Sequence, residues 1–326
     1  MHPAFSVIFL TTLIGAGQGL FLALYTSQVY SIFKLLPTQH MSLFYAVGSL
    51  IAVALLIAGL VASFFHLGHP ERAWRAASQW RTSWLSREVI VLPIAMGLIA
   101  LWGLAHYFDL TRPLFQAPGG TEVDLTLILG FLATIAAFAL FVCTGMIYAS
   151  IKFLQEWHTP LTIINFILLG SASGFLIATT LSALLGTHLT NFYAGWTLLF
   201  TILGFIFRGA SLLRNKRLRP KSDLRSAIGV RHSNMAQKAQ GAMGGSFNTR
   251  EFFHGKKDAF VKSVKYIFIV LTFLIPTALI IASFYQPGYL LPLSAFVIQY
   301  LGLIAERWYF FAEARHPQNI YYQSIA

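Results

Sequence analysis

The chain has 326 residues, of which 56% are hydrophobic and only 10% charged, and its net charge is +12. Soluble domains carry about 25% charged residues, so this composition excludes an ordinary soluble protein. The single cysteine, Cys143, lies in an apolar run. This chain therefore cannot form an internal disulfide or, alone, supply the four thiolates that usually hold an iron–sulfur cluster.

Apolar stretches of about 20 residues are long enough to cross a bilayer as helices. The sequence contains eight of them, at Ala4–Phe33, Met41–Phe65, Val89–Phe108, Leu125–Tyr148, Pro160–Leu185, Asn191–Leu213, Val261–Tyr285 and Tyr289–Phe311. They lack the alternating pattern of barrel strands, so we expect an all-α integral membrane protein with a single transmembrane domain over 1–326. The first stretch has no preceding Lys or Arg and is too long for the core of a cleaved signal peptide.

Glycines recur on two of these predicted spans. Gly15, Gly17 and Gly19 lie on the first, and Gly170 and Gly174 form a G-x-x-x-G pattern on the fifth. Small residues at this spacing let transmembrane helices approach closely, so we expect helix packing here. A glycine-lined ligand cleft is the alternative interpretation.

The basic residues divide very unequally between the two predicted sides of the membrane. One side, with both termini, collects 21 Lys and Arg residues, whereas the other has only Lys34 and Arg112. The positive-inside rule therefore predicts that both termini are cytoplasmic. A basic surface that docks an acidic partner is the alternative explanation, and the two are compatible.

A basic cytoplasmic loop is expected at 209–260, between the sixth and seventh spans. Its aromatic residues Phe247, Phe252 and Phe253 would be unfavourable in a solvated tail, which favours a docking element for another subunit over a disordered or lipid-bound loop. The sequence contains no nucleic-acid-binding module.

Several function classes find little support. Every Asp, Glu, Lys and Arg is expected at a span end or in a loop, which counts against a transporter with an ionisable pathway. The ten histidines also lie at expected span ends or in loops. A haem would need two histidines on different helices, and only His66 or His69 together with His158 leaves a haem site open. No hydrolase motif occurs.

The connection from His66 to Glu88 concentrates functional side chains at one interface. It contains Arg72 and three tryptophans, Trp74, Trp80 and Trp84, which is also typical of plain membrane anchoring. A quinone site needs an apolar slot, hydrogen-bonding groups and a titratable residue, and histidine suits the last role. The candidate site residues are His66, Arg72, Trp74, Glu88 and Arg307.

The segments His66-Leu-Gly-x-Pro-x-Arg-Ala73, Leu85-Ser-x-Glu88 and Glu306-Arg-Trp308 resemble the membrane-anchor subunits of dimethyl sulfoxide reductase, within the complex iron–sulfur molybdoenzymes. The resemblance implies an anchor without haem that exchanges ubiquinone or menaquinone. It also implies an iron–sulfur subunit and a molybdopterin catalytic subunit as partners, and a quinol-binding role for His66 with Arg72 and Glu88 nearby. Arg307 is a weaker correspondence.

Two features depart from the dimethyl sulfoxide reductase anchors, namely the predicted cytoplasmic orientation of the His66 face and the long basic loop. Both are more similar to anchors of cytoplasmic sulfite:quinone oxidoreductases in the bacterial inner membrane. We therefore expect electron transfer from sulfite to quinone. The alternatives are the anchor of a terminal reductase that oxidises menaquinol and, in a different class, a membrane transporter.

Overall fold

The structure is a computed structural model, and it describes residues 1–36, 41–116, 120, 122–220, 223–230, 232, 234–236 and 251–321. Within these residues, eight helical segments are long and apolar enough to span a membrane. They are α1 (Phe5–Ile32), α2 (Ser42–Phe64), α3 (Trp84–Tyr107), α4 (Leu125–Ala149), α5 (Pro160–Leu184), α6 (Thr190–Lys216), the continuous run of α9 (Asp258–Ile269), η2 (Val270–Leu274) and α10 (Ile275–Ser283), and α11 (Leu290–Glu313). The predicted all-α fold with eight spans is confirmed.

Five smaller elements lie outside the spans in the described part of the chain. They are the 3₁₀ segment η1 (Pro70–Gln79), the antiparallel strands β1 (Pro113–Gln116) and β2 (Glu122–Asp124), the short helix α7 (Leu224–Ile228) and the 3₁₀ turn η3 (Pro317–Tyr321). The sequence analysis did not predict the two short strands.

The helix ends follow local capping signals. The Ser83 hydroxyl accepts a hydrogen bond from the Ser86 backbone N–H, and Asp124 accepts one from Leu127. Thr159 caps α5, whose first residue is Pro160, a position where the missing N–H costs nothing. The Ser83 cap starts α3 five residues before the predicted Val89, so Glu88 belongs to the helix rather than to the preceding loop.

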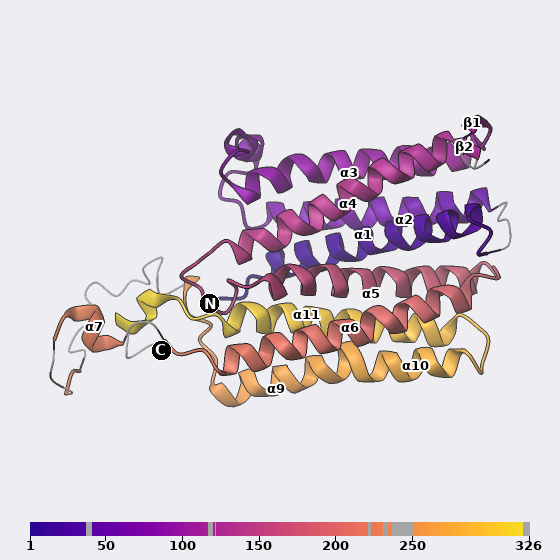
Figure 1. The fold of residues 1–326 in the computed structure, drawn as a ribbon. Coiled ribbons are helices and arrows are strands. Elements are labelled where there is room, and N and C mark those ends of the chain that lie inside the picture. The colour runs from indigo at the N-terminus through magenta and orange to yellow at the C-terminus, as the bar shows by residue number, and fades with distance from the viewer. Residues whose placement is uncertain are drawn as a thin grey trace.

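Both termini lie at one end of the bundle, together with α7 (Figure 1). We call this end the basic face, since it carries Arg72, Arg87, Lys152, Arg214 and Arg315, whereas Lys34 and Arg112 follow helices that end on the opposite side. The division of charge predicted from the sequence therefore corresponds to the two ends of the bundle.

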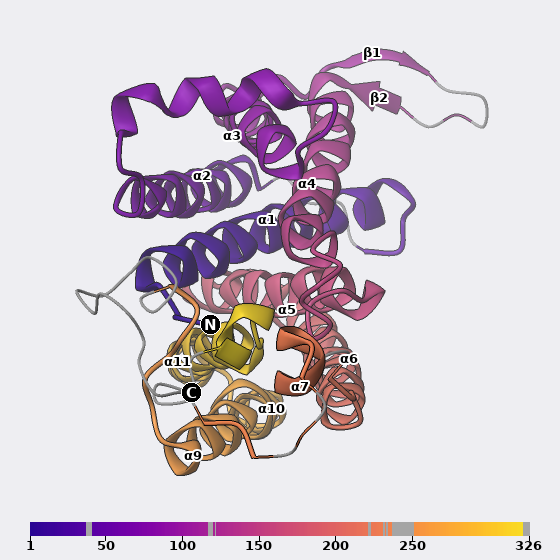
Figure 2. The ribbon, with the colours of Figure 1, turned by 90° about the vertical axis from the view of Figure 1, so that its left-hand side faces the viewer.

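Helices α1 and α5 form the centre of the bundle (Figure 2). Their most apolar windows are 72% and 78% buried, whereas those of the other spans are buried by 39% or less. Helices α2, α3 and α4 lie on one side of this pair, and α6, α9, α10 and α11 lie on the other. The bundle therefore has two groups of helices that share one central pair.

The central pair packs through glycines. A Cβ at Gly19 would collide with the Gly170 carbonyl, and one at Gly174 would collide with the Gly19 backbone. Gly17 faces the other way, and a Cβ there would lie 2.8 Å from the Ala52 carbonyl oxygen of α2. The packing interpretation of these glycines is confirmed.

Replacing Gly174 with leucine should therefore destabilise the protein strongly. Overpacking a close contact costs about 3 kcal/mol in the free energy of unfolding, and here the neighbouring atoms are backbone, which cannot swing away. Gly97→Leu on α3 is the matched control, because no atom lies within 4 Å of a Cβ there. Thermal unfolding in detergent should separate the two variants, and equal melting temperatures would contradict the packing role.

Candidate functional site

The connection between α2 and α3 lies on the surface of the basic face. His69 Nδ1 lies 3.1 Å and Arg72 Nε 3.5 Å from Glu71 Oε1, and all three side chains are more than half exposed. Trp74 is 72% exposed. Arg72 and Trp74, two of the predicted site residues, therefore belong to an exposed surface element.

Arginine and tryptophan alternate on this element and stack in pairs. The guanidinium of Arg75 lies over Trp74, that of Arg81 over Trp80 and that of Arg87 over Trp84, at 4.1 to 5.5 Å from the ring centroids. Arg87 also donates hydrogen bonds to the carbonyls of Trp80 and Arg81. These contacts fix the entry into α3, one turn before Glu88.

Glu88 is buried in the second turn of α3. The hydroxyl of Thr144 on α4 donates a hydrogen bond of 2.5 Å to Glu88 Oε1. Within the described residues, no Lys or Arg forms an ion pair with this carboxyl group. Glu88 is thus a buried acid with a neutral partner, a setting that favours proton exchange.

Arg307 is also buried, but in a different group of helices. Its guanidinium stacks on Phe166 of α5 at 3.8 Å, and Nη1 lies 3.2 Å from Glu306 Oε2. Arg208 of α6 lies on the other side of the same carboxylate, with Nε 2.7 Å from Glu306 Oε1 and Nη1 4.0 Å from Glu313 Oε2. Two arginines therefore hold Glu306 as a carboxylate.

This ion cluster corrects two expectations from the sequence. The loop expected at 209–260 starts later than predicted, because α6, which carries Arg208, continues to Lys216. Charged side chains were expected only at span ends or in loops, yet Arg208, Glu306 and Arg307 are 4% exposed or less within helices. Each charge is tolerated because a partner on a facing or adjacent position neutralises it.

An aromatic layer lies between Glu88 and Arg307. Tyr148 is one helical turn beyond Thr144 and stacks on Phe166 at 5.6 Å between ring centroids. Its ring also meets Trp157, Phe310 and Phe311 edge-on. Glu88 and Arg307 are therefore joined through α4 and α5, whereas the described residues show no contact of either with His66.

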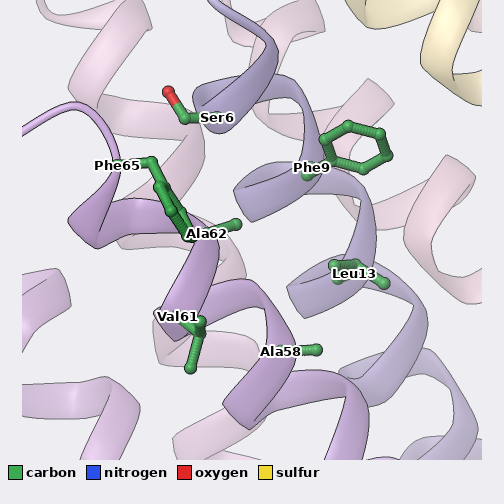
Figure 3. Close-up of a pocket in the computed structure, with 7 residues that line it drawn as sticks. All are labelled: Ser6, Phe9, Leu13, Ala58, Val61, Ala62 and Phe65. Carbon is green, nitrogen blue, oxygen red and sulfur yellow. The ribbon is translucent and has the colours of Figure 1, made fainter.

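An apolar groove lies between α1 and α2 near the basic face; its lining ends at Phe65, and the next residue, His66, is exposed. The groove encloses about 330 Å³ between α1 and α2 (Figure 3). Its lining comprises Ser6, Phe9 and Leu13 of α1 and Ala58, Val61, Ala62 and Phe65 at the end of α2. Partial burial lowers the pKa of His66. The exposed imidazole of His66 therefore directly follows the last lining residue of an almost wholly apolar groove.

The end of the long connection packs on this chain. Phe253 is buried, Phe252 stacks on His316 with 3.6 Å between ring centroids, and Asn319 Nδ2 donates to the Phe252 carbonyl. Phe247 lies outside the described residues. Of the three aromatics that suggested a docking element for another subunit, Phe252 therefore contacts the chain's own C-terminal segment and Phe253 is buried.

The sequence analysis missed Thr144, Arg208 and Glu313 as members of these clusters. A signal existed for Glu313, which lies seven residues after Glu306 and so on the same side of a helix. Arg208 directly follows an apolar run, and Thr144 lies inside one. Apolar runs locate spans, but they do not identify which polar side chains face a partner.

Eight apolar spans, a charged aromatic face and an apolar groove define a multi-pass helical membrane protein with a polar site at one end. The chain belongs to the DMSO reductase anchor subunit family, which it matches over residues 1–307. It is also 60% identical to a subunit of the sulfite dehydrogenase of Allochromatium vinosum, over 100% of both chains. It is therefore a membrane anchor subunit of an oxidoreductase family.

Glu306 and Glu313 should differ sharply in their contribution to stability. Glu306→Gln leaves Arg208 and Arg307 buried without a full counter-charge, which costs about 3–5 kcal/mol in the free energy of unfolding. Glu313→Gln should cost less than about 1 kcal/mol, because Arg208 keeps Glu306 and the Glu313 side chain is 16% exposed. Thermal unfolding of both variants in detergent measures the difference, and similar losses would argue against the central role of Glu306.

Proposed function

We propose that this chain is the quinone-binding anchor of a molybdopterin and iron–sulfur oxidoreductase complex. It passes electrons between the iron–sulfur subunit and the membrane quinone pool. The observation that carries the proposal is the apolar groove between α1 and α2, whose last lining residue, Phe65, directly precedes His66. Both the family and the relative named as part of a sulfite dehydrogenase support it.

The groove fits the chemistry of a quinone. Phenylalanine, leucine, valine and alanine side chains suit an isoprenoid tail, and Ser6 is the polar residue in the lining. A bound quinone accepts two electrons and two protons. The imidazole of His66 can bond a quinone oxygen and exchange a proton, while Glu88, on the neighbouring helix α3, is the second group that can exchange a proton.

The substrate and orientation follow from the same comparison. We propose that the complex oxidises sulfite on its molybdopterin subunit, as the name of the relative indicates for that protein. The basic face would bind the iron–sulfur and molybdopterin subunits in the cytoplasm of a bacterium, with the bundle in the inner membrane. Protons for quinone reduction would then come from the cytoplasm.

Filling the groove should block quinone access while leaving the partner subunits active. Ala58→Trp in the assembled complex should lower quinone-dependent sulfite oxidation more than tenfold, while activity with an artificial acceptor persists, because the indole occupies the slot. Leu50→Trp is the matched control, since Leu50 lies on the same helix and is 69% exposed. His66→Ala should give the same split between the two activities. Unchanged quinone turnover in both Ala58→Trp and His66→Ala would refute the site.

The proposed orientation predicts the behaviour of fused reporters. A fluorescent protein that matures only in the cytoplasm should fluoresce when fused after Ala326, since positive charge marks the cytoplasmic side. The same reporter inserted between Gln116 and Glu122, at the opposite end of the bundle, should stay dark. The reverse pattern would overturn the orientation and with it the cytoplasmic sulfite assignment.

A further inference from the structure

Thr144 differs from the threonines of the spans that donate to their own helix backbone. Six others donate to the carbonyl four residues earlier in their own helix, namely Thr11, Thr12, Thr26, Thr134, Thr179 and Thr180. This is the ordinary arrangement for a threonine in an apolar helix. Thr144 instead reaches from α4 to the buried carboxyl group of Glu88 on α3.

The two buried glutamates of the basic face, Glu306 and Glu88, therefore have chemically different partners. Glu306 lies between two guanidinium groups, which donate only and so stabilise only the carboxylate. Glu88 meets a hydroxyl group, which can donate to a carboxylate and can also accept from a protonated carboxyl group. A hydroxyl partner can thus hold the same carboxyl oxygen in both protonation states.

Among the residues around Glu88, Thr144 provides the hydrogen-bond partner of the carboxyl group. Helix α2 carries no charged residue between Ser42 and Phe64. The charged residues of η1, namely Glu71, Arg72 and Arg75, are exposed. From α4, the titratable groups within electrostatic range of Glu88 are the thiol of Cys143 and the phenol of Tyr148, on either side of Thr144.

We propose that Thr144 is a positioning residue that holds the Glu88 side chain in one place while Glu88 gains and loses a proton. The inference rests on the proposed function, in which Glu88 takes up a proton from water on the basic face and passes it on toward the bound quinone. The two electrons come from the reduced iron–sulfur cluster of the partner subunit. Thr144 itself undergoes no net change in this cycle.

The test compares three substitutions in the assembled complex. Thr144→Val preserves the shape of the side chain and removes the hydroxyl, so kcat with quinone should fall roughly tenfold, the loss expected for one hydrogen bond to a charged group. Thr144→Ser should restore most of the activity. Thr134→Val, on the same helix, removes a hydroxyl that bonds only its own backbone and should behave as wild type.

The pH profile distinguishes positioning from a purely structural role. The hydroxyl bonds the Glu88 carboxyl group in both protonation states, so the limb of the profile that reports Glu88 should change in Thr144→Val and return to its wild-type form in Thr144→Ser. Artificial-acceptor activity should stay unchanged in all three variants. Equal kcat and pH profiles for Thr144→Val and Thr134→Val would overturn the inference.

Failure of the proposed function gives a different result. If the wild-type complex reduces no quinone, or if Ala58→Trp and His66→Ala both leave quinone turnover intact, the quinone site itself is wrong. If those variants lose quinone turnover and Thr144→Val does not, only the role of Thr144 fails.

Discussion

The close crossing of α1 and α5 is the constraint on which the rest of the structure depends. In lipid there is no hydrophobic force between helices, so association relies on close backbone approach and on polar contacts. Gly19, Gly170 and Gly174 allow that approach, and every other span packs directly or indirectly on the resulting pair. The groove beside His66 is formed by α1 and α2, and Arg307 stacks on α5, so both candidate sites are positioned by this one crossing.

The two groups of helices around this pair handle buried charge differently. On the side of α6 and α11, the Glu306 carboxylate pairs with Arg208 and Arg307, and Glu313 Oε2 lies 4.0 Å from Arg208 Nη1. This cluster joins the helices at the cost of removing charges from water. On the side of α3 and α4, Glu88 has a hydroxyl partner and no ion pair within the described residues. The first arrangement suits a fixed joint between helices, and the second suits a group that changes its protonation state.

The sequence was sufficient for the spans, for the side on which basic residues gather and for the glycine contact, because each depends on local composition or spacing. It was insufficient for the site. The sequence places His66, Arg72, Trp74, Glu88 and Arg307 near one interface but does not specify whether they meet. The fold separates them into an exposed element, the end of α2 beside a groove, and two buried positions. Whether a residue near the end of a span lies in the helix or in the loop depends on where the helix starts. The Ser83 cap places Glu88 inside α3, but one serine in the sequence is a weak signal of a helix start. Partners such as Thr144 depend on helix rotation, which hydropathy does not specify.

The π-helical turn η2 has a consequence for which side of the seventh span faces lipid. Buried residues recur there every four positions, at Val264, Phe268, Thr272, Pro276 and Ile280. In a regular α-helix with 3.6 residues per turn, each such step would drift by about 40° around the axis. The wider turn at Val270–Leu274 takes back part of that drift, and the Thr272 carbonyl there accepts a hydrogen bond from Gln299 of α11. A helical wheel drawn with a single period would therefore misassign the second half of this span. It would turn residues that contact α6 and α11 toward the acyl chains.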